Sequence, residues 1–398
     1  MYSLSFPRKG VRLPWQTNIF KEDETLYPNG EKAPVQLFYP GRYFPEPVSI
    51  FIRDDKNNVK ELPFNNALFD MPDDSPAHGL PEGFGFAGFR IIDIPVERKC
   101  GPQVGGDIEA NFQNSNFFNL VSVSDKSQSN LLQAKKDFPF IRTSKDYKKS
   151  ITNNIDIVVI ATPTNTHFQI SKFALMMKKH ILVEKPISLS EKEVQNLEKI
   201  SKRNKKKIFV DYPFIFSGSI NYVKKIIESN RFGKLNEIES YREQAPVRKD
   251  VNVVWDLAVH DLSILFYLLK SNPTKSNSLK INSAQSPKSD TAFINLTYKN
   301  KLNVFIKNTW ISPTKIRLMK FKFKNAIIYC DENESMYKIK IYFKKTKQAK
   351  YSLEVPEIDL AEPLSRLVNY IYKNIKNNER NIFDNMNINI TKTLKKIS

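Results

Sequence analysis

"IDIVVIATPTNTH" at residues 155–167 and "HILVEKP" at residues 180–186 are the two stretches that identify the architecture of this chain. Each opens with an apolar run rich in β-branched residues, which is short enough to be a strand buried on both faces. The residues between the two runs place Leu, Phe and Met side chains on one face of a helix. A buried strand, a helix and a second buried strand form the repeating unit of a parallel sheet.

The same alternation continues on both sides of this unit. Strand patterns and helical patterns follow one another at residues 119–125, 126–138, 190–204 and 206–212. Ser190 is followed three residues later by Glu193, which is the arrangement of a helix capping box. We therefore expect an α/β fold with a Rossmann-like, doubly wound parallel sheet, whose ligands bind at the carboxyl ends of the strands.

A different pattern fills the C-terminal part of the chain. Four strand-like runs separated by short polar turns occupy residues 291–298, 302–310, 315–323 and 325–330. Helical patterns close the chain at residues 363–377 and 386–397. Short strands that follow one another in this way predict an open, mostly antiparallel sheet, which forms a second α/β domain with the helices.

The composition changes within the chain. The formal net charge of the 398 residues is +20, but residues 1–98 hold 11 Lys and Arg against 14 Asp and Glu, together with 7 of the 12 glycines. This shift marks a boundary near residues 95–100 between two pieces. With the patterns above, it divides the chain into a β-rich fragment at residues 1–98, a Rossmann-like domain at residues 99–213 and a C-terminal α/β domain at residues 214–398.

"PEGFGFAGFR" at residues 81–90 matches the dinucleotide-binding pattern G-x-G-x-x-G through Gly83, Gly85 and Gly88. A cofactor loop of this kind must follow a strand and open a helix, so that helix N–H groups meet the pyrophosphate. Here the pattern follows Pro-rich turn material and precedes "FRIIDIP", which is a strand-like run. We therefore reject residues 81–90 as the cofactor loop.

This first piece instead resembles another family. The series "PVQLFYPGRYFPEPVSIFI" and "LPEGFGFAGFRI" is similar to the N-terminal β-sandwich domain of the periplasmic glucan biosynthesis proteins, over about residues 12–91. The resemblance implies a partial β-sandwich at the N-terminus. It also leaves a glucan-biosynthesis-associated protein as one alternative function.

The second piece resembles the Gfo/Idh/MocA oxidoreductases over about residues 100–398. The resemblance rests on "ATPTNTH" at residues 161–167, on "EKP" at residues 184–186, and on "WDLAVHD" at residues 255–261. It implies an NAD(P)-dependent dehydrogenase with a Rossmann domain and a C-terminal substrate domain, whose open sheet could join subunits into a homo-oligomer. "RKDVNVVWDLAVHD" points more narrowly to branches that act on a sugar or a sugar nucleotide.

The resemblance and the residue chemistry together give a candidate catalytic group of Lys185, Asp256 and His260. An ammonium at the end of a buried strand can hold a substrate hydroxyl or relay its proton. Asp256 and His260 are four residues apart, so on an α-helix they share a face, where the carboxylate could orient the imidazole. His260 could then take the alcohol proton as hydride leaves the same carbon. The alternative is a satisfied Asp–His pair inside an apolar helix.

NAD is the expected cofactor, and NADP is expected to bind less well. Asp125 ends a strand pattern 20 residues after Gly105, where a carboxylate can bind both ribose hydroxyls and repel a 2′-phosphate. A role in starting the next helix remains the alternative. Other cofactor-binding residues follow from the resemblance: Gly101, Gly105, Thr162, Pro163, His167, Glu184 and Lys185.

The expected glycine loop departs from the family pattern. "VERKCGPQVGGDIEANF" at residues 96–112 keeps Gly105 as the third glycine, places Gly101 one residue out of register and adds Pro102. No apolar strand directly precedes it. The first strand of the Rossmann sheet is therefore missing, or it is borrowed from "FRIIDIP", and we predict that residues 89–94 take its place. A non-catalytic fusion protein with a degenerate loop is the main alternative to an enzyme.

The remaining sequence features bear on partners and location. Lysines are scattered rather than interleaved with aromatic residues, so we expect a small anionic or sugar substrate rather than nucleic acid, which stays a third alternative. The longest apolar stretch contains three ionisable residues and predicts no membrane span. Two cysteines, and no apolar segment in the first 15 residues, suit a cytoplasmic protein. No residues are assigned to a metal.

Overall fold

The computed structural model describes residues 3–5, 49–53, 59–63, 89–94, 117–283, 288–344 and 350–398. The chain divides into two compact units, residues 1–85 and residues 86–398, and each is described by itself. In the first unit, β1 (Ser3–Ser5), β2 (Ser49–Arg53) and β3 (Val59–Pro63) pair in an antiparallel sheet with β2 in the middle. This agrees with the β-rich character expected for the N-terminal fragment.

The second unit contains the expected parallel sheet. In the described residues its strands run in the order β6-β5-β4-β7-β8-β9, and every neighbouring pair is parallel. The strands are β4 (Phe89–Ile94), β5 (Phe118–Ser124), β6 (Arg142–Ser144), β7 (Ile157–Ile160), β8 (His180–Val183) and β9 (Ile208–Val210). This is the strand order of a Rossmann fold, in which the direction of winding reverses at the first strand.

Strand β4 confirms the prediction for residues 89–94. Ile91 is paired with Leu120 of β5 on one side and with Ile157 of β7 on the other. The strand thus occupies the central first position of the sheet, although it comes from the part of the chain that resembles glucan biosynthesis proteins. A central parallel strand must be apolar and must form hydrogen bonds on both edges. The short β-branched run at residues 89–94 meets both requirements.

Helices connect the parallel strands. They are α2 (Gln128–Asp137), α3 (Tyr147–Ser150), α4 (Thr164–Met176) and α5 (Glu191–Asn204). The Ser190 hydroxyl accepts a hydrogen bond from the Glu193 backbone N–H, so it caps α5 as expected. The Glu193 carboxylate, however, accepts from the Ser188 hydroxyl rather than returning to Ser190. The hydrogen bond between Ser188 and Glu193 therefore fixes the segment between β8 and α5.

A larger sheet forms the other half of the second unit. Its described strands run in the order β11-β12-β13-β10-β14-β15-β16-β17, and only β10 and β13 are parallel. The strands are β10 (Leu235–Glu243), β11 (Lys275–Ile281), β12 (Thr291–Thr297), β13 (Asn303–Thr309), β14 (Ile316–Phe323), β15 (Ala326–Asp331), β16 (Ile339–Phe343) and β17 (Ser352–Glu354). The open, mostly antiparallel sheet expected from the sequence is therefore present.

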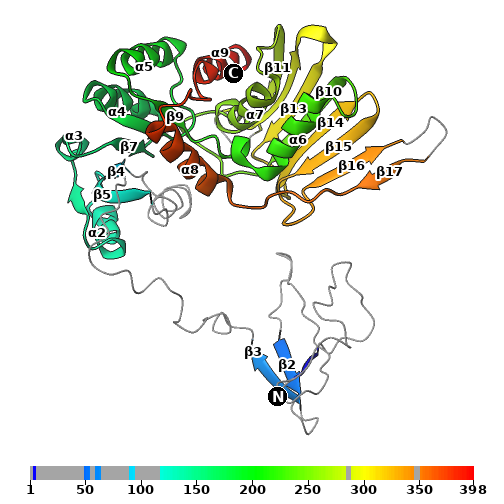
Figure 1. The fold of residues 1–398 in the computed structure, drawn as a ribbon, viewed down its shortest axis with the longest axis horizontal. Coiled ribbons are helices and arrows are strands. Elements are labelled where there is room, and N and C mark those ends of the chain that lie inside the picture. The colour runs from blue at the N-terminus through cyan, green and yellow to red at the C-terminus, as the bar shows by residue number, and fades with distance from the viewer. Residues whose placement is uncertain are drawn as a thin grey trace. The chain divides into compact units, whose positions relative to one another are not determined.

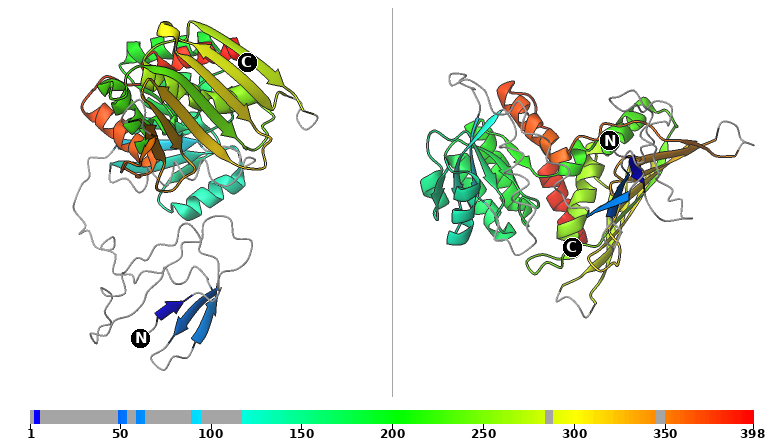
Figure 2. Two further views of the ribbon diagram at one scale, coloured as in Figure 1. Left: turned by 90° about the vertical axis from the view of Figure 1, so that its right-hand side faces the viewer. Right: turned by 90° about the horizontal axis from the view of Figure 1, so that it is seen from below.

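Helices cover one face of this sheet and fill the space between the two sheets (Figure 1). They are η2 (Pro213–Phe216), α6 (Gly218–Ser229), η3 (Val254–Ala258), α7 (Val259–Leu269), α8 (Pro363–Lys376) and α9 (Met386–Ile397). Helix α9 contacts α5 of the parallel sheet as well as α7 and β11, and Figure 2 shows α8 and α9 between the two sheets. One continuous core of buried apolar residues therefore runs through both halves.

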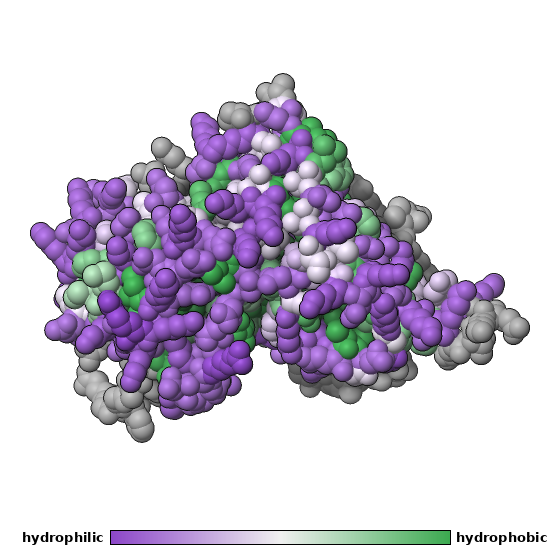
Figure 3. Space-filling model, turned by 90° about the horizontal axis from the view of Figure 1, so that it is seen from above, coloured by the Kyte–Doolittle hydropathy of each residue, from purple (hydrophilic) through white to green (hydrophobic). Residues whose placement is uncertain are grey.

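The surface is predominantly hydrophilic. Figure 3 shows hydrophilic residues spread over one whole face, with hydrophobic residues only in small areas between them. None of the described helices is long and apolar enough to span a membrane.

Candidate active site

Polar side chains follow the strands of the parallel sheet at its carboxyl edge. Asp125 comes directly after β5, Thr162 lies two residues after β7, and Glu184 comes directly after β8. Lys185 is next along the chain, and the Lys185–Pro186 peptide bond is cis. The carboxyl ends of parallel strands meet at one edge, so these residues line the position where Rossmann folds bind ligands.

Lys185 and Asp256 join the two halves of the second unit. The Lys185 Nζ lies 3.0 Å from the Asp256 Oδ1 and 3.0 Å from its main-chain oxygen. Trp310 donates from its indole Nε1 to the Asp256 Oδ2 over 2.9 Å. Burial alone would raise the pKa of Asp256, but the charges of Lys185 and Arg248 outweigh it and lower the pKa. The carboxylate is therefore ionised, and it fixes the lysine that follows β8.

Arg248 extends this network toward the loop after β7. Its guanidinium lies 3.3 Å from the Asp256 Oδ1, and it donates to the Asp250 Oδ2 over 2.6 Å. It also donates to the Thr164 hydroxyl at the start of α4 over 3.3 Å. Nothing in the sequence indicated this role of Arg248 beyond its place eight residues before Asp256, and nothing indicated a role for Trp310.

His260 lies on α7, half-buried, with its ring edge-on to the Phe214 ring at a centroid separation of 5.2 Å. Its Nδ1 is buried and has no hydrogen-bond partner in the described part of the chain. Burial lowers the pKa of His260 well below its usual value, and the charges of Lys185 and two arginines, Arg242 and Arg317, lower it further. The imidazole is therefore neutral near pH 7, which is the form that can accept a proton.

The structure does not join Asp256 to His260 in the way expected from their spacing. The described donors to the Asp256 carboxylate are Lys185, Arg248 and Trp310. Residues 254–258 form a π-helical turn, and these three donors engage both carboxylate oxygens of Asp256. Asp256 therefore positions Lys185, and the imidazole stands on its own beside the same group.

His167 lies inside the fold. Its Nδ1 is 2.8 Å from the main-chain oxygen of Pro186, and its Nε2 is 2.7 Å from that of Thr162. Burial lowers the pKa of this imidazole despite both hydrogen bonds. The ring therefore ties the loop after β7 to the loop after β8, so it acts on the site by positioning. Thr166 donates to the Pro163 main-chain oxygen in the same loop.

Asp125 stands at the carboxyl end of β5 and is 6% exposed. Its Oδ1 accepts from the Ser127 backbone N–H over 2.7 Å, and its Oδ2 accepts from the Asn130 side chain over 2.8 Å. The N-cap of α2 is Ser127 rather than Asp125. The alternative role of Asp125, in starting this helix, therefore holds only in part. Each carboxylate oxygen keeps a further lone pair, which a ribose hydroxyl can use.

Glu184 forms a carboxyl pair that the sequence did not suggest. Its side chain is hydrogen-bonded to that of Asp211, which follows β9, and a contact of this kind requires one shared proton. Burial raises the pKa of both groups, and that of Asp211 well above its usual value, so we assign the proton to Asp211. The Glu184 Oε2 accepts from the Lys185 backbone N–H over 3.1 Å. Gly101 and Gly105 lie outside the described residues.

Comparisons with known proteins agree with this arrangement. Residues 101–212 match a family model described as an oxidoreductase family with an NAD-binding Rossmann fold. That family is Gfo/Idh/MocA. Residues 14–125 match the model of the periplasmic glucan biosynthesis protein, so the second match runs into β5. Both resemblances expected from the sequence are confirmed.

Individual relatives cover only parts of the chain. The 1-carboxy-3-chloro-3,4-dihydroxycyclohexa-1,5-diene dehydrogenase of Comamonas testosteroni is 28% identical over 158 residues, which are 37% of this chain and 40% of the relative. The glucans biosynthesis protein D 2 of Ralstonia nicotianae is 34% identical over 107 residues, 26% of this chain and 19% of the relative. The chain thus spans less than half the length of these relatives.

The fold extends further than the sequence similarity. The solved UDP-N-acetylglucosamine 3-dehydrogenase of Acidithiobacillus ferrooxidans superposes with a TM-score of 0.67 at 18% identity, and the match covers 78% of this chain and 96% of that protein. The Gfo/Idh/MocA-like part therefore has the two-domain fold of such a dehydrogenase.

Proposed function

We propose that this protein is an NAD-dependent dehydrogenase that oxidises a secondary alcohol of a sugar or a sugar nucleotide. One observation carries the proposal: the ion pair of Lys185 with Asp256 brings the end of β8 to the helical segment that holds His260. An ammonium and a neutral imidazole then flank one place at the carboxyl edge of a Rossmann sheet.

The described residues fit a nicotinamide cofactor. Asp125 is placed for the adenosine ribose, and the loops after β7 and β8 lie where the nicotinamide half binds in this fold. When bound, the cofactor would supply the hydride acceptor. The loop that contains Gly101 and Gly105 would complete the pyrophosphate site.

The protein residues would handle the proton. The substrate hydroxyl would donate its hydrogen bond to neutral His260, while the Lys185 ammonium would stabilise the developing negative charge on the oxygen. The proton passes to His260, and the carbon loses two electrons as hydride and becomes a carbonyl. Asp256 would keep Lys185 charged and fixed, because it accepts from the Nζ through two oxygens.

Two measurements test the proposal. NADH and NADPH binding to the full chain, followed by fluorescence, tests the cofactor, and we expect NADH to bind more tightly because Asp125 opposes a 2′-phosphate. NADH formation from NAD with a panel of neutral sugars, sugar acids, inositols and sugar nucleotides tests the reaction. Binding of neither cofactor would favour the non-catalytic fusion, whose specific support is the departure of "VERKCGPQVGG" from the glycine pattern. Tighter binding of NADPH would refute the role of Asp125.

A further inference from the structure

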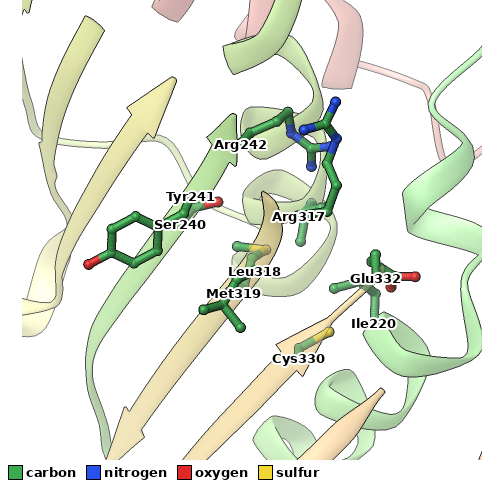
Figure 4. Close-up of a pocket in the computed structure, with 10 residues that line it drawn as sticks. Ile220, Ser240, Tyr241, Arg242, Arg317, Leu318, Met319, Cys330 and Glu332 are labelled. Atoms are coloured by element: carbon green, nitrogen blue, oxygen red, sulfur yellow. The ribbon is translucent and has the colours of Figure 1, made fainter. Parts of the chain in front are cut away.

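Two arginines stand directly opposite one another on neighbouring strands of the larger sheet. Arg242 near the end of β10 is the cross-strand partner of Arg317 near the start of antiparallel β14. Figure 4 shows the two guanidinium groups meeting on the side of the sheet that the helices cover, while Tyr241 points away from it. Like charges at directly opposed positions destabilise a sheet, so this pair needs a reason.

Only one of these two arginines forms an ion pair with a carboxylate in the described part of the chain. Arg242 is 4% exposed, and its Nε lies 3.3 Å from the Oδ1 of fully buried Asp261. Arg317 donates instead to main-chain oxygens, at 2.7 Å to that of Ile316 and 3.0 Å to that of Gln244. In the described part of the chain no carboxylate forms an ion pair with Arg317. The cluster therefore keeps an excess positive charge.

Arg242 also keeps donors for a ligand. Its two terminal nitrogens donate no hydrogen bond to any residue that the structure describes, although the side chain is nearly buried. The guanidinium lies over the Phe214 ring, 4.4 Å from its centroid, and the same ring contacts His260 edge-on. The donors of Arg242 are thus one aromatic ring away from the imidazole that would accept the proton.

The electrostatics agree with the geometry. Burial and the charge of Arg242 lower the pKa of Arg317 to about 10. The arginine pair also contributes to the lowered pKa of His260. A bound anion would offset the repulsion between the two guanidinium groups, and an anion in this position would be held by charge-assisted hydrogen bonds.

We propose that Arg242 and Arg317 bind a carboxylate of the substrate, which is then a polyhydroxylated ring acid such as a hexuronate. The inference rests on the proposed dehydrogenase function and narrows its substrate class. A carboxylate held here would leave the ring of the acid to reach His260 and Lys185, so that a ring hydroxyl takes the position of the reacting alcohol.

The space beside the pair favours a carboxylate over a phosphate. A cavity of about 10 Å³ lies between the arginines, Ser240 and Met319, which is room for a group the size of one water molecule. One carboxylate oxygen fits such a space better than a phosphoryl group with three oxygens. Glu332 also lines the cavity, but its Oε2 accepts from Lys338 over 3.0 Å, so its charge is paired.

Isothermal titration calorimetry of the full chain, with and without NADH, tests this proposal apart from catalysis. The probes are D-glucuronate and D-galacturonate, the neutral sugars D-glucose and D-galactose, and D-glucose 6-phosphate. We expect the uronates to bind more tightly than the neutral sugars. Arg317→Gln should weaken uronate binding by about 10- to 100-fold, the scale of a lost hydrogen bond to a charged group. Arg317→Lys should weaken it less, because it keeps the charge but loses the planar fork.

Arg231→Gln is the matched control, since Arg231 is an exposed arginine whose ion-pair partner, Glu354, lies on the edge strand β17 of the larger sheet. It should leave uronate binding unchanged. The proposal is overturned if neither uronate binds, if Arg317→Gln binds them as tightly as the parent, or if glucose 6-phosphate binds more tightly than both. Uronate binding without NADH formation would support the anion site and refute the dehydrogenase function.

Discussion

Two groups of charged residues flank His260, and they differ in how well their charges are matched. In the Lys185 group, Asp256 is shared by Lys185 and Arg248, and Arg248 also has Asp250. In the Arg242 group, two opposed guanidinium groups have one ion-pair partner among the described residues, the carboxylate of Asp261. A matched group is suited to hold a catalytic lysine in place. A group with an excess positive charge is suited to bind an anionic ligand. This difference between the two groups can be tested.

Breaking the matched group at its shared carboxylate should have the largest effect. Asp256→Asn leaves Lys185 and Arg248 facing a neutral amide in a mostly buried place. We expect a loss of about 3–5 kcal/mol in the free energy of unfolding, the usual cost of removing one partner from a buried ion pair. Urea unfolding of the full chain at pH 7 measures it.

Asp250→Asn is the control for this substitution. Asp250 bonds the same arginine, but its side chain is 43% exposed, so its loss should cost less than about 1 kcal/mol. Equal losses for the two variants would show that Asp256 is not the central charge of the group. The claim that Asp256 balances the charges of Lys185 and Arg248 would then be wrong.

Removing the lysine itself tests the chemistry rather than the stability. Lys185→Ala should lower turnover about 10²-fold or more, the scale of an acid–base contribution, with NAD binding largely unchanged. His260→Ala should have an effect of similar size, because the imidazole would accept the proton. Steady-state kinetics with NADH detection, beside NADH titrations, separates the two readouts. Turnover equal to that of the parent in both variants would contradict the assigned roles.

The charges around His260 also predict a pH dependence. The imidazole faces Phe214 and three cationic groups, and its pKa in the folded protein lies well below that in the unfolded chain. The unfolded state therefore binds the proton first, so this residue favours the native state above about pH 6.5 and loses that contribution as the pH falls. We expect kcat/KM for alcohol oxidation to hold from pH 8 to below pH 6.5, and to decline only as the pH approaches the lowered pKa of the imidazole.

His260→Gln separates this effect from other titrations. The parent should lose stability between about pH 6.5 and pH 5 relative to the variant, as measured by urea unfolding across that range. An acid limb of the parent activity at or above pH 6.5 would show that the imidazole is not held neutral. The lowered pKa assigned to it would then be wrong.

Much of the fold could be read from the sequence, because apolar periodicity reports buried strands directly. The parallel strands, their connecting helices and the replacement of the first strand by residues 89–94 all followed from short β-branched runs. Strand β10 gave no such signal. Its helix-covered side presents Ile238, Ser240 and Arg242 in succession, so polar residues occupy positions where the pattern requires apolar ones.

The site was predictable only where its residues lie close together in the sequence. "EKP" and "WDLAVHD" identified Lys185, Asp256 and His260, but only the folded chain shows that Asp256 binds Lys185, 71 positions away, rather than His260. Arg242 and Arg317 are 75 positions apart, and only the pairing of β10 with β14 brings them together. No local pattern contains that register, so the unmatched group could be found only in the folded protein.

The smallest expected effect comes from the unmatched group in the free protein. Arg317→Met removes three hydrogen bonds to main-chain oxygens but also removes the repulsion between Arg317 and Arg242. These contributions oppose each other, so we expect the free energy of unfolding to change by less than about 1 kcal/mol. Arg248→Met has no such compensation, because Asp256 loses one of its cations, and it should cost more. Urea unfolding of both variants without ligand makes the comparison. If the two substitutions lower the free energy of unfolding equally, the arginine pair stabilises the fold as the Lys185 group does. The proposal that its excess charge binds an anion would then lose its support.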